Sequence, residues 1–144
     1  MGGGSVKSEF YGTEIFLDNE ATAEYLDICR GALKRGDPGE YYEEHQIVPC
    51  GFWTALPGAV KGKLPEAMPV EKRVSCKLLP EEHFRCHELL TLMFEKGTKQ
   101  QSHAMFDFQR RNAETAEQYA DKQTTTNAVK DWRNRPEHKK YEEM

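Results

Sequence analysis

Three histidines carry the chemistry that the sequence suggests first. His83 and His87 are four residues apart in a stretch with helical spacing, which places both imidazoles on one helix face, one turn apart. Two such histidines can share a divalent cation, although the pair alone is more often two unrelated surface residues. His45 lies near the end of a predicted strand, and a hairpin would return the chain so that it faces the helix. Three imidazoles leave positions on a metal ion for water and phosphate, whereas a structural zinc is closed by four protein ligands.

The cysteines Cys29, Cys50, Cys76 and Cys86 offer a second set of ligands. None forms a Cys-x-x-Cys pair, and no cationic and apolar secretion signal begins the chain. We therefore expect reduced thiols in a cytoplasmic protein. A closed zinc module that combines Cys50 or Cys76 with a histidine stays open as an alternative, because the spacing does not decide it.

A strand, a long loop, a second strand and a helix are the elements that must position the histidines. Residues 41–48 and 72–79 are predicted strands, the second with alternating apolar side chains. Residues 49–71 hold four of the seven prolines and three glycines, which predicts an ordered irregular loop. A helix is predicted from Pro80 to about residue 95, since proline suits the first turn. Its core-facing residues are expected to be Phe84, Leu90, Met93 and Phe94.

Helices are expected on both sides of this unit. The first runs to Arg35, with Asn19 before its start and Gly36 as its stop. Its apolar face is predicted to be Tyr25, Leu26, Cys29 and Leu33. A further helical region follows at about 100–122, and a last helix is expected around Trp132.

The predicted fold class is therefore α+β. Residues 1–6 are assigned to a flexible linker and 7–40 to an N-terminal helical extension. The strand–loop–strand–helix core takes residues 41–97, and 98–144 form a helical C-terminal region. The length of 144 residues fits one domain with extensions.

The composition argues against a membrane-spanning protein, and the charge leaves nucleic-acid binding open. The mean hydropathy is −0.81, and no apolar run approaches the ~20 residues of a membrane span. The net charge of −4 argues mildly against nucleic acid, but residues 1–45 carry 10 acidic and 4 basic side chains whereas 96–144 carry 8 acidic and 10 basic. Phosphate binding depends on local clusters more than on net charge. The acidic N-terminal region is a candidate surface for a protein partner.

Two stretches resemble the motif of phage-type HNH endonucleases, which have a ββα-metal (His-Me) finger. Residues 41–49, Tyr-Tyr-Glu-Glu-His-Gln-Ile-Val-Pro, are similar to the family's strand, where two adjacent histidines precede Ile-Ile/Val-Pro. Residues 78–94 are similar to its helix, Leu-Thr-x-x-Glu-His-Phe-x-x-His-x-Leu-Leu. The two matches stand in the family's order, and together they are far more specific than either alone.

The resemblance implies a role for each matched residue. His45, His83 and His87 fall on metal ligands, and Gln46 falls on the second histidine of the pair, the general base of the family. An amide has no accessible pKa for taking up a proton near neutral pH. Gln46 can orient a water but cannot accept its proton, so we expect impaired turnover. Whether Gln46 is an introduced or a natural residue stays open.

Two further positions depend on the resemblance. The middle Asn of the motif is missing, and Ser75 is the nearest polar candidate for its bracing role. Arg85 is a candidate phosphate contact, although helix geometry can point it away. The C-terminal stretch resembles the Trp-x-x-x-Pro-Glu-His-basic tails of phage homing endonucleases. It implies DNA contacts by Arg133, Arg135, Lys139 and Lys140, against the alternative of an amphipathic helix packed through its tryptophan.

The leading expectation is a metal-dependent endonuclease that hydrolyses DNA phosphodiester bonds in a bacterial host cytoplasm. One divalent ion (Mg²⁺, Mn²⁺, Zn²⁺ or Ni²⁺) is the expected cofactor and double-stranded DNA the expected partner, with no membrane and the oligomeric state left open. The first alternative is a catalytically inactive relative that binds DNA or protein as a phage regulator. The second alternative is the structural zinc module.

Overall fold

The computed structural model of the chain describes residues 6–56, 58–60, 67–110 and 115–123. Its fold is α+β, as the sequence predicts. The elements in chain order are α1 (Glu20–Arg35), β1 (Glu43–Gln46), β2 (Ser75–Leu78), α3 (Pro80–Leu90) and α4 (Lys99–Gln109), with short 3₁₀ turns at Thr13–Ile15, Cys50–Ala55 and Val70–Lys72. Residues 116–123 are also helical. The predicted helix around Trp132 and the basic tail lie outside the described residues.

The two strands form an antiparallel ladder in which His45 is opposite Cys76 and Gln46 is opposite Ser75. Both strands are four residues long, shorter than predicted, because pairing stops where a 3₁₀ turn occupies residues 70–72. The helix α3 ends at Leu90 and not near residue 95. Tighter turns continue the chain there, and the carbonyl of Met93 accepts a hydrogen bond of 2.9 Å from the backbone N–H of Leu17.

The helix α1 has the start and the stop that its sequence predicts. The Asn19 side chain accepts a hydrogen bond from the Thr22 backbone N–H at 2.9 Å, and Gly36 ends the helix with a positive φ of 71°. The predicted apolar face is wrong at Leu33, whose side chain is 40% exposed. Ala32 is buried instead, because seven residues after Tyr25 the helix returns to almost the same direction.

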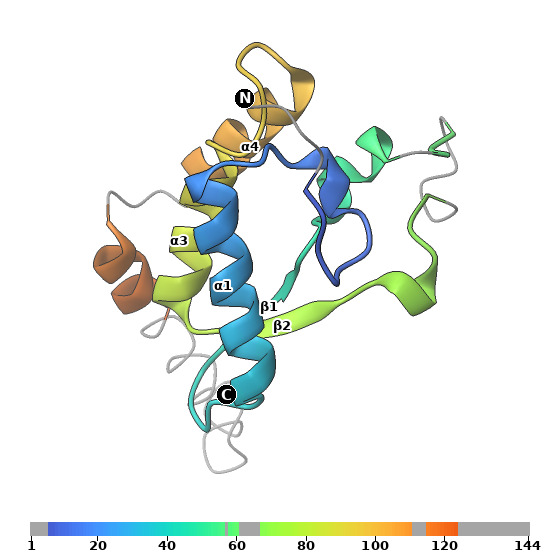
Figure 1. Cartoon of the computed structure of the whole chain (residues 1–144). Helices are drawn as coiled ribbons and strands as arrows, with labels where there is room; N and C mark the ends of the chain where they lie inside the picture. The colour runs from blue at the N-terminus through green and yellow to red at the C-terminus, as the bar shows by residue number, and fades with distance from the viewer. Residues whose placement is uncertain (1–5, 57, 61–66, 111–114, 124–144) are drawn as a thin grey trace, which may run out of the picture.

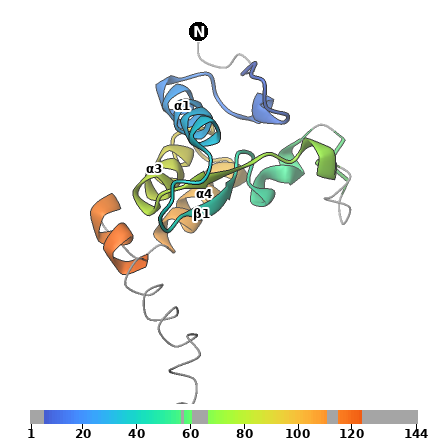
Figure 2. The same cartoon turned by 90° about the horizontal axis from the view of Figure 1, so that it is seen from below.

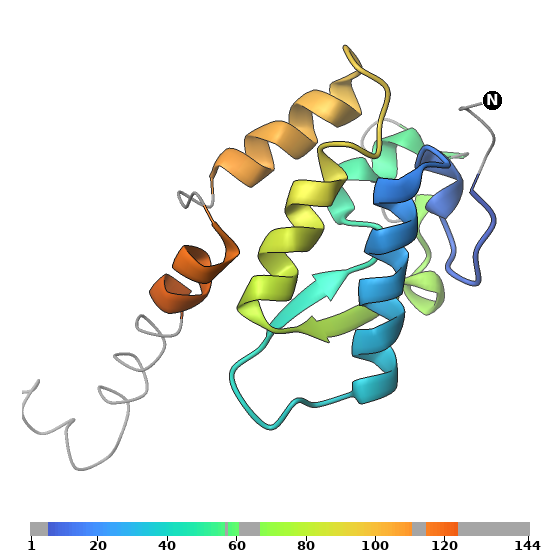
Figure 3. The ribbon, with the colours of Figure 1, turned by 60° about the vertical axis from the view of Figure 1, so that its left-hand side comes forward.

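The helix α3 lies between α1 and α4 (Figures 2 and 3), and α1 also packs against β2 (Figure 1). One hydrophobic core runs through these elements, and it includes the predicted residues Leu90, Met93 and Phe94. The segment 7–40 therefore shares its core with the strand–strand–helix unit. The predicted helix over 100–122 is two elements, since α4 ends at Gln109 and the next described helical residues are 116–123. Within the described residues, every helix is too short or too polar to cross a bilayer.

Candidate metal centre

His45, His83 and His87 converge on one point between the sheet and α3. One ring nitrogen of each lies within 4.8 Å of the other two, and the ring centroids are 4.8 to 5.2 Å apart. His83 Nε2 and His87 Nε2 are separated by 3.1 Å. Two imidazole nitrogens bound to one tetrahedral zinc at 2.0–2.1 Å stand about 3.3 Å apart. The residues present therefore fit a shared metal ion.

The local structure explains why these three side chains meet. The strand β2 leads through Leu79 directly into α3, so the helix begins beside the hairpin. Glu82 fixes that start, because its carboxylate accepts a hydrogen bond of 2.8 Å from the Leu79 backbone N–H. The spacing of four residues then puts His83 and His87 on the helix face that looks toward β1, where His45 is buried.

Two carboxylates contact the Nδ1 atoms of His83 and His87, which are the outer ring nitrogens because Nε2 of each faces the other histidine. His83 Nδ1 lies 3.1 Å from Glu43 Oε1, and His87 Nδ1 lies 3.2 Å from Asp107 Oδ2 on α4. Since a carboxylate accepts hydrogen bonds, each imidazole carries its proton on Nδ1 and turns the lone pair of Nε2 toward the other histidine. Two lone pairs that face each other at 3.1 Å need a shared proton or cation. Carboxylate–histidine–metal arrangements of this kind fix the tautomer and the ring orientation in metal sites.

The Tyr25 hydroxyl fixes the tautomer of His45. The proton of this imidazole is on Nε2, whereas those of His83 and His87 are on Nδ1. The Tyr25 hydroxyl donates to the Ile47 carbonyl at 2.8 Å and lies 2.7 Å from His45 Nε2. Because the hydroxyl proton is used by the carbonyl, the tyrosine oxygen accepts from Nε2–H, and the lone pair of His45 is on Nδ1. Tyr25 is fully buried, and burial raises its pKa well above the ordinary value. It is therefore a neutral and permanent orienting group.

Glu43 is a partly buried carboxylate whose pKa favours the ionised form. Burial raises its pKa, but hydrogen bonds from His83 and Tyr119 lower it more, and the net pKa is below the ordinary value of 4.5. The Tyr119 hydroxyl donates to Oε1 at 2.8 Å, and the Tyr41 hydroxyl donates to Oε2 at 3.0 Å. A negative charge next to His83 favours a cation at the histidine group.

The three-histidine group is largely buried, and its most exposed member is His83. His45 and His87 are 4% and 5% exposed, whereas the His83 side chain is 12% exposed. An ion here is shielded from bulk water, which strengthens its electrostatic interactions with the histidines and with Glu43.

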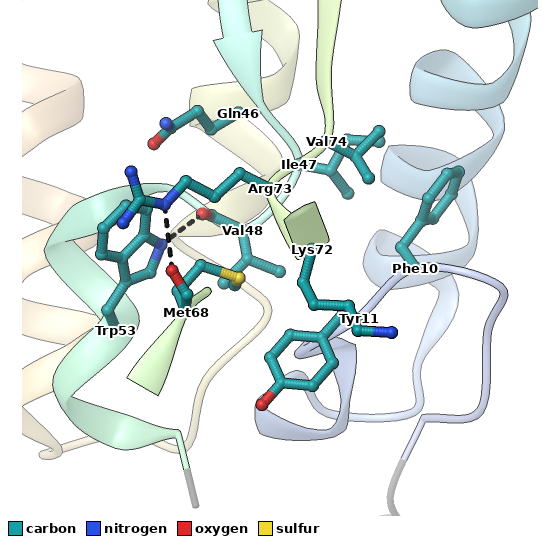
Figure 4. Close-up of a pocket in the computed structure, with 10 residues that line it drawn as sticks. All are labelled: Phe10, Tyr11, Gln46, Ile47, Val48, Trp53, Met68, Lys72, Arg73 and Val74. Carbon is teal, nitrogen blue, oxygen red and sulfur yellow. Dashed lines mark hydrogen bonds between the residues drawn. The ribbon is translucent and has the colours of Figure 1, made fainter. Parts of the chain in front are cut away.

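Gln46 lies next to His45 in β1 and so on the other face of the strand. Its side chain lines a cavity of about 10 Å³ together with Arg73, Trp53 and Met68 (Figure 4). The Arg73 guanidinium stacks 4.7 Å from the Trp53 ring centroid, and its Nε donates to the Met68 carbonyl at 3.0 Å. In the close-up the Gln46 amide and the Arg73 guanidinium lie on the same side of the cavity.

Other predicted site residues are placed elsewhere. Ser75 is exposed opposite Gln46, so it does not brace the long loop. Arg85 is bound by carboxylates, with Glu24 at 2.6 and 2.8 Å and Glu88 at 2.6 Å, which makes it unsuitable as a phosphate contact. The proposed DNA-contacting residues lie outside the described part of the chain, and they are Arg133, Arg135, Lys139 and Lys140.

The cysteines divide into two kinds. Cys50 is exposed and belongs to no candidate metal group among the described residues. Cys29 and Cys86 form a second group with His45, in which all three ligand atoms lie within 4.8 Å of one another. Cys76 is buried, but it is not a member of that group.

Sequence reasoning missed the residues that orient the histidines. Glu43 had a usable signal, since it is two residues before His45 and strand alternation places both on one face. The sequence indicated Tyr25 only as a residue on the apolar side of a helix. Asp107 had no signal, because nothing in the order of residues indicates that α4 passes His87.

No protein-family model, curated protein or solved structure matches this chain. The functional argument therefore rests on the motif and on the geometry of the site. That geometry can do one thing well, which is to hold a divalent ion on three imidazole nitrogens and leave the remaining positions for small oxygen ligands.

Proposed function

We propose that this chain is the metal-binding core of an HNH-type DNA endonuclease, with slow turnover as it stands. The observation that carries the proposal is the convergence of His45, His83 and His87 in a strand–strand–helix unit, with an acceptor on the outer nitrogen of each. Such convergence is unusual for surface histidines, and it occurs at the positions where the sequence resembles the nuclease motif.

The protein groups divide the work of phosphodiester hydrolysis. A divalent ion on the three histidines supplies charge stabilisation at a phosphate oxygen and at the leaving 3′-oxygen. The histidines bind it as neutral ligands, and Glu43 keeps His83 oriented. Gln46 can hold a water by hydrogen bonding, but it cannot take the proton of that water. The water would then have to be deprotonated by solvent, and we therefore expect slow turnover.

Arg73 beside Gln46 is the candidate contact to a phosphodiester, since the cavity of about 10 Å³ there holds no more than a water molecule. Arg73 offers a guanidinium whose position is fixed by the Trp53 ring and the Met68 carbonyl, so little conformational entropy is lost when it binds an anion. Phosphate contacts of this kind position a duplex without reading its sequence. The basic tail with Arg133 and Lys139 would add further contacts to the backbone.

A plasmid-nicking assay tests the proposal. The chain as it stands, Gln46→His and the double variant Gln46→His/His83→Ala are each incubated with Mg²⁺, Mn²⁺, Ni²⁺ or Zn²⁺. We expect Gln46→His to cut about 10²–10⁴-fold faster than the parent chain, because that is the usual contribution of a general base. The double variant should return to background. Equal rates for all three proteins would contradict a nuclease that uses this site.

A second candidate is binding of nucleic acid without hydrolysis, which the amide at position 46 favours. Gel-shift titrations of the same variants at several salt concentrations separate the two. A chain that binds DNA with a steep salt dependence, and that does not cut after Gln46→His, is a binding module. A chain that cuts after that single change is a nuclease whose base has been replaced.

A further inference from the structure

Three thiols meet behind the histidine group, on the side of Tyr25. Cys29 comes from α1, Cys76 from β2 and Cys86 from α3, and all three are buried. The sulfurs of Cys29 and Cys86 lie within 4.8 Å of each other, and the Cys76 thiol is close enough to Cys29 to shift its pKa. The thiol groups and the three-histidine group therefore adjoin each other, and His45 belongs to both.

We propose that Cys29, His45 and Cys86 form a second metal site, selective for a thiophilic divalent ion of the zinc and cadmium class. Their ligand atoms already lie within 4.8 Å of one another. Two sulfurs bound at about 2.3 Å to a tetrahedral ion stand about 3.8 Å apart, so closing the site needs side-chain movements of about 1 Å. Thiolates prefer soft ions, and the oxygen-preferring Mg²⁺ and Mn²⁺ bind them poorly.

Metal binding at the second site exchanges thiol protons for the metal ion. The thiols of Cys29 and Cys86 each lose a proton to solvent, and two sulfur–metal bonds replace the two S–H bonds. A coordinating thiol is deprotonated outright, so a bound cation would hold both sulfurs as thiolates.

In any one tautomer His45 has a single unprotonated ring nitrogen. It can therefore bind a metal ion at only one of the two sites. In the present arrangement its Nε2–H donates to Tyr25, which leaves Nδ1 for the three-histidine group. An ion on the thiol side takes Nε2 in place of that hydrogen bond, and the proton of His45 moves to Nδ1. The two sites therefore compete for one imidazole, and a thiophilic ion withdraws His45 from the histidine group.

Cadmium titration of the metal-free chain tests the site, with the ultraviolet charge-transfer band of cadmium–thiolate bonds as the signal. We expect the band to saturate at about one Cd²⁺ per chain. It should be lost in Cys29→Ser and in Cys86→Ser. It should persist in Cys50→Ser, which changes an exposed thiol, and in Cys76→Ser, which changes a buried thiol of the same cluster. Cadmium NMR of the unmodified chain should show a resonance with two sulfur ligands, a measurement that does not depend on the folding of any variant.

The outcome is independent of the nuclease proposal. His83→Ala removes the histidine group and should leave the cadmium band unchanged, whereas Cys86→Ser should leave Mn²⁺ binding by the three histidines within about twofold. Absence of a thiolate band in the folded parent chain would overturn the second site. So would a band that survives Cys86→Ser, or a cadmium resonance with nitrogen and oxygen ligands only.

Discussion

The two faces of β1 differ in how completely their polar groups are fixed. On the His45 face, the imidazole nitrogens contact the buried Tyr25 hydroxyl and the partly buried Glu43 and Asp107 carboxylates. On the Gln46 face, an arginine stacked on a tryptophan borders a small cavity. The first face carries a group of residues that could hold a metal ion, whereas we propose the Arg73 guanidinium on the second face as a phosphate contact. Adjacent residues of one strand thus belong to two differently built surroundings.

The largest expected effect comes from removing a ligand on the His45 face. His87→Ala should weaken divalent-metal binding by more than about 100-fold, since loss of orienting partners alone costs roughly 10–100-fold. The matched control is His103→Ala, because His103 is an exposed histidine in contact with Phe52 and outside the candidate metal groups. Calorimetric titration with Ni²⁺ measures both. Equal losses in the two variants would mean that the histidines act as unconnected surface ligands.

Removing an orienting group should have a smaller effect on the same face. Tyr25→Phe keeps the buried ring and deletes the hydroxyl that accepts from His45 Nε2, and Asp107→Asn weakens the hold on His87 Nδ1. We expect each to lower metal affinity by roughly 10–100-fold with all three ligands still present. The same titration measures this, with far-ultraviolet circular dichroism as a check on folding. Unchanged affinity in both variants would show that the ligand orientation does not depend on these partners.

The Gln46 face should respond in the opposite way. Arg73→Met removes a stacked cation, and we expect a loss of about 0.5–1 kcal/mol in the free energy of unfolding, weaker DNA binding and unchanged metal affinity. Lys34→Met is the control, because it removes the same charge from an exposed side chain of α1 that does not line the cavity. Urea unfolding and gel shifts measure the two effects. A loss of metal affinity in Arg73→Met would end the separation of the two faces.

The smallest effect is expected from acid. The pKa values of Glu82 and Glu43 are lowered in the folded chain, in each case by hydrogen-bond partners that outweigh the effect of burial. The folded state therefore binds fewer protons than the unfolded state. The stabilisation is complete above the unfolded value near 4.5 and is lost as the pH falls below it.

Glu82→Gln isolates one part of this dependence. The variant removes the ion pair with Arg35, in which the atoms are 2.8 Å apart, and both side chains are about one-third exposed. We expect a flatter decline of stability between about pH 6 and pH 3, by less than about 1 kcal/mol because solvent screens the pair. Urea unfolding over this range measures the slope. A slope equal to that of the parent chain would show that the pair contributes nothing.

The order of elements and the shared helix face of His83 and His87 were predictable because helical spacing and strand alternation are local rules, whereas the approach of His45 was predicted from the expected return of the chain and from the motif. The sequence predicted the ends of α1 correctly through Asn19 and Gly36, which act on their own neighbours. It failed where tertiary contacts decide. Leu33 is exposed since Ala32 has the core position, and β1 is shorter than the predicted strand over 41–48, since β2 pairs with it over four residues only.

The contacts between distant segments were beyond prediction for the same reason. Asp107 reaches His87 only because α4 packs on α3, and Cys29 reaches Cys86 only because α1 packs on α3. Neither spacing nor composition contains that information. The cysteine alternative was therefore assigned to Cys50 and Cys76, whereas the structure groups Cys29 and Cys86 with His45.

Anomalous diffraction from crystals of the Ni²⁺-loaded chain tests the central claim most directly, since it locates the ion without reference to activity. The account predicts one strong peak at about 2.0–2.2 Å from a ring nitrogen of His45, His83 and His87, with Tyr25, Glu43 and Asp107 still on the outer nitrogens. A peak bound by only one of these histidines, or ordered histidines with no peak among them at saturating Ni²⁺, would contradict it.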